Sequence, residues 1–212
     1  MWTLLLLTAR LGAAVVAGCG ADRATLEIRN VHIIDPETGG LVRNATIAIS
    51  NGRICRIGST SVKRSARSKH VMDGRGRFAL PGFTAAAPIG SEMRWVGYGV
   101  TELSPQTSLR ADQPDADLHE QLARLVERGN TPLQALQAAT VKPGAPPVTY
   151  GRSSTLVLGS EANFVLLEQD PRVDIANTRS ISLVVLHGQP LGLVLLARAR
   201  AGREIDLQPF SR

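Results

Sequence analysis

The chain has 212 residues, of which 43% are hydrophobic and 20% charged, a composition typical of a globular protein of one or two domains. Its net charge is +6, but the arginines are scattered and only 4% of residues are aromatic, so we expect no nucleic-acid partner. The densest basic run, Lys63–Lys69, lies between two strand-like segments and is predicted to be a solvated loop rather than a binding patch.

The first 18 residues contain an apolar segment interrupted by Arg10. This segment is short for a membrane-spanning helix and is more typical of a signal peptide. The residues Val16–Cys19 resemble the lipobox of bacterial lipoproteins, in which the cysteine becomes the lipidated first residue of the mature chain. The resemblance implies a lipid anchor at Cys19 and a location in the bacterial cell envelope, on the periplasmic or outer-membrane face. A misassigned start codon or an unprocessed leader is the alternative.

Apolar and polar residues then alternate with the period of half-buried strands. Strands are predicted over Thr25–Ile34, Asn44–Ile49 and Arg53–Gly58. Turn residues at Asp35–Gly40 separate the first two strands, and Asn51-Gly52 is a hairpin signal between the second and third. Short antiparallel strands joined by tight turns favour a sheet or sandwich lobe.

Cys55 lies in the middle of the third strand and is predicted to be a small buried hydrophobic residue. Because Cys19 and Cys55 occur in different contexts, no disulfide is expected between them. His32 also occupies a strand position and is expected to be structural.

Four motifs in this lobe carry a family resemblance: Asp-Pro-Glu-Thr-Gly at 35–39, Asn-Gly-Arg-Ile at 51–54, Asp-Gly-Arg-Gly-Arg at 73–77 and Leu-Pro-Gly-Phe at 80–83. Together they resemble the amidohydrolase superfamily, and more closely its imidazolonepropionase and prolidase-like members. In that family the lobe is half of a small β-sandwich, and the chain enters a (β/α)8 barrel at the Pro-Gly turn. The resemblance implies a hydrolase acting on C–N bonds that uses zinc or another divalent metal.

The metal of that family is held first by an aspartate and a His-x-His pair on the first barrel strand. Alternate residues of a strand face the same way, so two imidazoles at this spacing can bind one ion, which then activates a water molecule. The corresponding positions here are Ala85, Ala87 and Ile89, whose side chains have no lone pairs to offer a metal. The sequence therefore predicts no catalytic residue and no cofactor.

Three polar residues remain as weak candidates for a replacement site: Asp112, Glu102 and His119. Asp112 falls where the resemblance puts a late aspartate, although a solvated loop carboxylate is favoured. Only 35 residues separate Gly82 from Leu118. That is the length of about one βα unit, whereas a (β/α)8 barrel takes about 250 residues. Most of the barrel is therefore expected to be absent.

Two helices are predicted in the second half. The first covers 115–128, with an apolar face, a cap from Asp115 or Asp117 and a stop at Gly129. The second begins at Thr131, where Gln134 completes a capping box. Strands are expected after them, over Thr155–Leu158, Asn163–Glu168, Ile181–His187 and Leu193–Leu196.

These elements predict a mixed α/β fold with β predominant: a composite β-sandwich of N- and C-terminal strands plus a short helical remnant of a (β/α)8 barrel. The predicted boundaries are a signal peptide at 1–18, the first sandwich half at 19–82, the barrel remnant at 83–149, the second sandwich half at 150–197 and a C-terminal tail at 198–212.

Three functional hypotheses follow. The first is a lipid-anchored, amidohydrolase-like protein without catalysis that keeps the sandwich as a binding or structural module. The second is a metal-dependent hydrolase whose site is completed by a partner chain or by carboxylates such as Glu92, Glu102 and Asp112. The third is a deleted gene product without activity. Self-association is also expected, because the helical leucines need a surface to cover them: Leu118, Leu122, Leu133 and Leu136.

Overall fold

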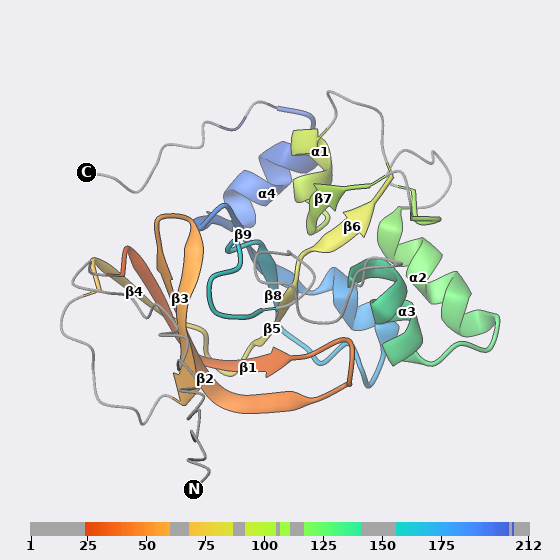
Figure 1. Cartoon of the computed structure of the whole chain (residues 1–212). Coiled ribbons are helices and arrows are strands. Elements are labelled where there is room, and N and C mark those ends of the chain that lie inside the picture. Colours follow the sequence, from red (N-terminus) through yellow and green to blue (C-terminus); the bar gives the residue numbers. More distant parts are fainter. Residues whose placement is uncertain are drawn as a thin grey trace, which may run out of the picture.

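The computed structural model describes residues 24–59, 68–86, 92–104, 107–110, 117–140, 156–203 and 205 (Figure 1). Its elements are β1 (Leu26–Ile34), β2 (Leu41–Ser50), β3 (Arg53–Ser59), β4 (His70–Asp73), β5 (Phe78–Pro81), β6 (Phe83–Ala85), α1 (Glu92–Val96), β7 (Val100–Leu103), α2 (Leu118–Glu127), α3 (Pro132–Thr140), β8 (Phe164–Leu167), the 3-10 helix η1 (Ile175–Arg179), β9 (Ile181–Leu186), β10 (Gln189–Gly192) and α4 (Leu193–Arg200). None of the helices in these ranges is long and apolar enough to cross a membrane.

One large sheet joins the two ends of the chain. Its order is β10-β9-β8-β5-β1-β2-β3, and β4 pairs with β1 beside β5. The N- and C-terminal parts meet where β5 pairs antiparallel with β8, with Leu80 opposite Val165 and Pro81 opposite Phe164. The C-terminal strands therefore return to the N-terminal ones, as predicted. They do so within a single connected sheet, however, so the two-sheet sandwich is not confirmed.

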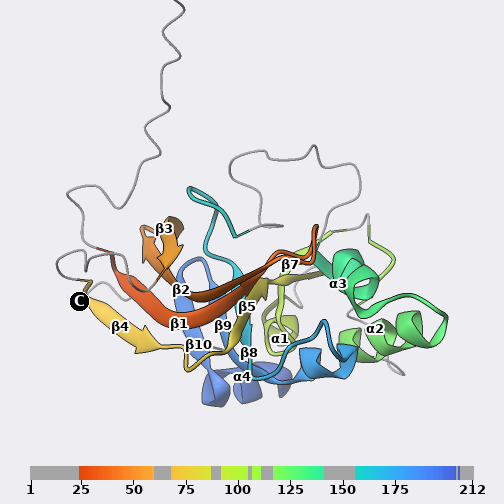
Figure 2. The ribbon, with the colours of Figure 1, turned by 90° about the horizontal axis from the view of Figure 1, so that it is seen from below.

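The central strands of this sheet are buried on both faces. On β8, Val165 and Leu167 belong to one apolar cluster, whereas Phe164 and Leu166 belong to another. The first cluster also contains residues of all four α-helices, which lie along one side of the sheet in Figure 2. The second cluster brings residues of β1–β3 together with residues of β8 and β9. This two-sided burial explains why β8 is apolar throughout rather than alternating.

A small second sheet follows the Pro-Gly turn. Strands β6 and β7 are parallel, with Phe83 opposite Val100 and Ala85 opposite Leu103. On the other side of β6, the backbone N–H of Ala86 donates to the carbonyl of Leu109, and an isolated parallel bridge forms at Arg110. Three parallel segments thus lie side by side directly after the large sheet, and α3 packs against β6.

Both predicted helices form, although the first spans Leu118–Glu127 and so begins three residues later than the predicted 115–128. Asp117 caps α2 by accepting the Glu120 N–H at 2.8 Å. Thr131 and Gln134 make a reciprocal capping box before α3, with bonds of 2.8 and 3.2 Å. Gly129 has a φ of +97°, a left-handed conformation that suits glycine at a helix end.

The predicted strand at Leu193–Leu196 is wrong, because these residues begin α4, and β10 occupies the four residues before it. A run of four apolar residues does not distinguish a strand from a helix. Here the following Ala-Arg-Ala-Arg favours helix, and Leu196 and Ala199 are buried three residues apart on the face toward α1. Leu156–Leu158 is likewise not a strand.

The leucines of the helix pair are covered within the chain. Leu118, Leu122 and Leu136 are no more than 2% exposed, and Leu133 lies against Gly39. The argument for self-association from uncovered leucines is therefore wrong, although oligomerisation itself stays a prediction.

Cys55 agrees with the prediction in its burial and differs from it in its bonding. It is buried, at 8% exposure, as predicted. It is also disulfide-bonded, which the sequence had not led us to expect. The other cysteine of the sequence, Cys19, lies outside the described residues.

Candidate functional site

The first ligand position of the resembled family lies at the end of β6. Ala85 is fully buried there and belongs to the same apolar cluster as Phe83 and Leu118. A methyl group therefore occupies the place where the resemblance would require a carboxylate. Ala87 and Ile89 lie outside the described residues, as do Asp112 and the proposed lipidation site Cys19.

The two weak candidates that the structure describes lie on different elements. Glu102 is on β7, opposite Thr84, and is half-buried. His119 is in the first turn of α2 and is only 3% exposed. Over the described ranges, no group of three or more His, Cys, Asp or Glu side chains is close enough to hold a metal ion. The residues described thus do not fit the metal that the resemblance implies.

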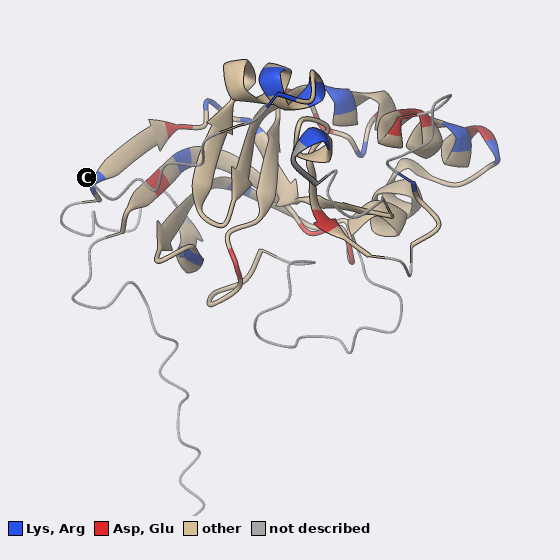
Figure 3. Ribbon diagram, turned by 90° about the horizontal axis from the view of Figure 1, so that it is seen from above, with Lys and Arg blue, Asp and Glu red and all other residues tan. Residues whose placement is uncertain are grey.

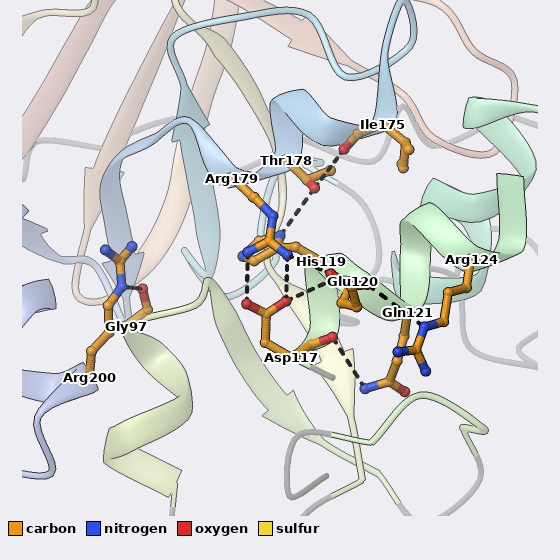
Figure 4. Close-up of polar contacts among 10 residues, drawn as sticks. All are labelled: Gly97, Asp117, His119, Glu120, Gln121, Arg124, Ile175, Thr178, Arg179 and Arg200. Carbon is orange, nitrogen blue, oxygen red and sulfur yellow. Dashed lines mark hydrogen bonds and ion pairs between the residues drawn. The ribbon is translucent and has the colours of Figure 1, made fainter. Parts of the chain in front are cut away.

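His119 is held by polar groups from two other parts of the chain, and Figure 4 shows one of them, the hydroxyl of Thr178. Its Nδ1 lies 3.1 Å from the hydroxyl of Thr178, on η1, and the ring also hydrogen-bonds to the backbone of Tyr98, after α1. The ring packs edge-on against Phe83 at a centroid distance of 5.8 Å. The imidazole therefore ties α2 to η1 and to the segment that enters β7.

Burial is the main reason why His119 is neutral. Removal of the ring from water lowers its pKa from the ordinary 6.5 to about 4, and nearby Arg179 and Arg200 act in the same direction. The Asp117 carboxylate is the next largest influence after burial and acts in the opposite direction, to raise the pKa of the ring, but burial outweighs it. The described ring is buried, and its contacts are a hydrogen bond to Thr178 and edge-on packing against Phe83, which are contacts of packing.

An ion-pair network surrounds the N-terminus of α2. The guanidinium of Arg179 donates to both carboxylate oxygens of Asp117, at 2.7 and 3.0 Å, and lies 3.5 Å from Glu120. Burial acts to raise the pKa of Asp117, but the hydrogen bonds from Arg179 and the Glu120 N–H outweigh it and hold that pKa below its ordinary value. Beside this network, Arg200 of α4 donates to the Gly97 carbonyl at 2.7 Å.

A buried carboxylate lies on the large sheet. Glu27 of β1 is 3% exposed and accepts from Arg29 at 2.6 Å, from Arg56 at 3.0 Å and from the hydroxyl of Ser68. Burial acts to raise the pKa of Glu27, but the bonds from Ser68 and Arg29 outweigh it and lower that pKa. The cluster joins β1 to β3 and to Ser68, two residues before β4, and so ties these segments together.

Sequence reasoning found His119 but not its partners. Thr178 and Arg179 are separated from it by about 60 residues and belong to a short 3-10 helix with no periodic signal. The pairing of Glu27 with Arg29 on β1 had only a weak signal in the sequence. Alternate residues of a strand share a face, so these two side chains lie on the same side of β1. Basic residues are spread over the described part of the molecule (Figure 3).

Comparison with solved structures identifies the fold. A protein from Bifidobacterium longum described as a prolidase superposes with a TM-score of 0.59 at 12% identity, covering 83% of this chain and 99% of that one. Molinate hydrolase gives 0.60 at 12% identity, covering 81% and 95%, and A. niger ochratoxinase gives 0.60 at 11%, covering 78% and 95%. These proteins are members of the amidohydrolase superfamily. The chain thus has an amidohydrolase-like fold, mixed and strand-rich, with one large sheet and few helices.

Sequence comparison adds a weaker match. The adenine deaminase of Desulforamulus reducens is 33% identical over 78 residues, which is 37% of this chain and 13% of that enzyme. The chain therefore spans only a small part of the curated relative that it matches. No protein-family model matches the sequence.

Proposed function

We propose that this chain is a non-catalytic, amidohydrolase-like module that keeps the large sheet and its covering helices as a binding or structural unit. The observation that carries the proposal is Ala85, whose methyl group is fully buried in apolar surroundings at the first ligand position. Placing a carboxylate there would bury a charge, which is unfavourable without a cation or donors to pair with it.

The spacing of the remaining elements supports the same proposal. The large sheet is followed by β6, β7 and the short bridge at Arg110, and α2 begins soon after. A closed barrel places ligands from several strands around one ion. Three parallel segments offer few such positions, and two of the resembled ligand positions carry Ala87 and Ile89.

We further propose that the chain is anchored to a bacterial membrane through Cys19, because the preceding residues match the lipobox pattern of an aliphatic residue and two small ones. Growth with an alkyne-tagged fatty acid tests the anchor. The tag is expected on the wild-type chain and is expected to be absent from Cys19→Ser. Equal labelling of both chains would contradict the anchor.

The competing candidate is a metal-dependent hydrolase of C–N bonds whose site is completed by a partner chain. The amidohydrolase-like fold and the match to adenine deaminase are the two observations that favour this hydrolase candidate. A third alternative, a deleted gene product without activity, predicts poor cooperativity on unfolding.

Metal analysis and activity assays separate the first two candidates. The purified chain is loaded with zinc, dialysed and measured by mass spectrometry, then assayed with adenine, N-acyl amino acids and dipeptides. The proposal predicts well below one zinc per chain and no turnover. Stoichiometric zinc with hydrolysis would refute it, and Asp112→Asn and Glu102→Gln would then show whether either carboxylate holds the ion.

A further inference from the structure

We propose that β4 is an edge at which two copies of this chain join their large sheets, in an antiparallel pairing of the two β4 strands centred on Val71. In the described part of the chain, β4 pairs only with β1. Figure 2 shows β4 at the left-hand margin of the molecule. The proposal goes beyond the function proposed above and depends neither on the loss of catalysis nor on the lipid anchor.

Backbone groups of β4 face away from β1 at alternate residues. The N–H groups of His70 and Gly74 donate to carbonyls of β1 and of the residue before it, at 3.2 and 2.6 Å, so the even-numbered residues face β1. Successive residues of a strand direct their N–H and C=O groups to opposite sides, so those of Val71 and Asp73 point to the outer edge. An unpaired strand edge is a template for a strand of another chain.

The other two edges of the large sheet are less open. Strand β10 carries Pro190, which has no N–H to donate. On β3, the N–H of Ile54 donates to the carbonyl of Ser160 and its carbonyl accepts from Gly159, so this segment covers the start of that edge. Strand β4 has neither protection in the described ranges, and the Val71 side chain is 51% exposed.

The exposed side chains at β4 are complementary to themselves when the strand direction is reversed. Lys69, Val71 and Asp73 are exposed, whereas the two residues between them are half-buried. An antiparallel pair centred on Val71 places valine opposite valine, and Lys69 of each copy opposite Asp73 of the other. Two-fold symmetry forms this ion pair twice. A second copy of this chain is therefore the occupant that the edge fits.

Both charged groups are available for this contact. Within the described ranges, Lys69 has no carboxylate partner. Asp73 uses its Oδ1 to accept from the Asn30 amide and the Arg75 N–H, both at 3.0 Å, which leaves its Oδ2 for the partner's lysine. Shifting the pairing by two residues would put Val71 opposite Asp73 and separate the charges, so the ion pairs select one register.

Sedimentation velocity of the purified full chain tests the interface. The wild-type chain is expected to form a dimer that depends on concentration and weakens in high salt, because exposed ion pairs are screened. Lys69→Glu creates two like-charge pairs and is expected to raise the dimer Kd about tenfold. Arg203→Glu makes the same charge change at an exposed site after α4 and is expected to alter Kd less than about twofold. A monomer at every concentration, or equal weakening by both variants, would overturn the proposal.

Cysteine cross-linking tests the register. In the proposed pair the two Val71 Cα atoms lie about 5.5 Å apart, which a disulfide can span. With oxidised glutathione, Val71→Cys is expected to give a covalent dimer in which the tryptic peptide 70–75 is joined to itself. Val42→Cys, on β2, is the matched control, because Val42 is 53% exposed but lies away from the edge. No such cross-link at position 71, or equal self-cross-linking at both positions, would overturn the pairing.

Discussion

His119 is a buried histidine whose neighbours keep it neutral, and this makes the stability of the fold depend on pH. The ring pKa is about 4 in the folded chain and near 6.5 when exposed. Between these values the unfolded chain binds more protons than the folded one, so stability rises with pH across the window and is lost as pH falls. The expected loss from pH 7 to pH 5 is about 2 kcal/mol.

Urea unfolding at these two pH values measures the effect. His119→Gln removes the titrating group while leaving an amide to hydrogen-bond, so its stability is expected to change much less between pH 7 and pH 5. His187→Asn is the matched control, because His187 is an exposed turn residue with a φ of +48°, which asparagine tolerates. A wild-type chain with the same stability at both pH values would contradict the assignment of His119.

Two threonines give opposite expectations for the loss of a hydroxyl. The Thr101 hydroxyl is buried with no hydrogen-bond partner in the described chain, so Thr101→Val is expected to leave stability unchanged or raise it by up to about 1 kcal/mol. The Thr178 hydroxyl donates to Ile175 at 2.7 Å and contacts His119, so Thr178→Val is expected to cost about 1–3 kcal/mol. Chemical denaturation of both variants checks the pair. Equal losses would show that Thr101 has a partner.

At the scale of the elements, the backbone of Gly82 lies close to the side chain of Thr101, where the large sheet meets the small parallel sheet. A methyl group added to Gly82 would lie 2.0 Å from the Thr101 hydroxyl and 2.7 Å from the Thr101 Cβ. Gly82→Ala is therefore expected to cost about 2–4 kcal/mol, because either the turn or β7 must move.

The matched control for this substitution is Gly58→Ala, on β3, where an added methyl meets nothing within 4 Å. It is expected to be neutral or slightly stabilising when both melting temperatures are compared with wild type. A Gly82→Ala chain as stable as Gly58→Ala would show that β6 and β7 are not packed as described.

Local signals predicted the elements best where side chains act on their own backbone. Asn51 and Gly52 both have positive φ, at +50° and +72°, as the Asn-Gly hairpin signal requires. The capping box before α3 also follows from neighbouring residues alone. The helix at Leu193 was missed because its type depends on packing against α1, and the joining of β5 to β8 brings together residues about 80 apart, which no local pattern encodes.

The candidate site was less predictable than the fold. That Ala85 offers no ligand atom could be seen directly in the sequence, because a methyl group cannot bind a metal wherever it lies. The role of His119 could not be seen, because its neutrality results from burial and from groups on η1 and near α1. Its position in α2 followed from helix periodicity, whereas its contacts depend on how the helix packs.

At the scale of the whole molecule, we expect one unfolding transition. The apolar cluster that contains the helices also contains Leu80, Val165 and Val184 of the large sheet, so neither part is buried without the other. Trp95, beside this cluster, is a probe of the helical side once Trp2→Phe has removed the other tryptophan. Its fluorescence and the far-ultraviolet dichroism of the sheet are expected to change at the same denaturant concentration. Separate or gradual transitions would instead favour a deleted gene product.

The pairing of β5 with β8 determines how much the length of the segment between these two strands matters for stability. Pro81 and Phe164 are neighbours in the sheet although 82 residues lie between them, so the chain leaves the sheet after the first of these residues and re-enters it at the second. The entropy of closing such an excursion grows only with the logarithm of its length, about 0.6 kcal/mol for each doubling. The large sheet can therefore accept inserted segments of very different length between β5 and β8 at little cost in free energy.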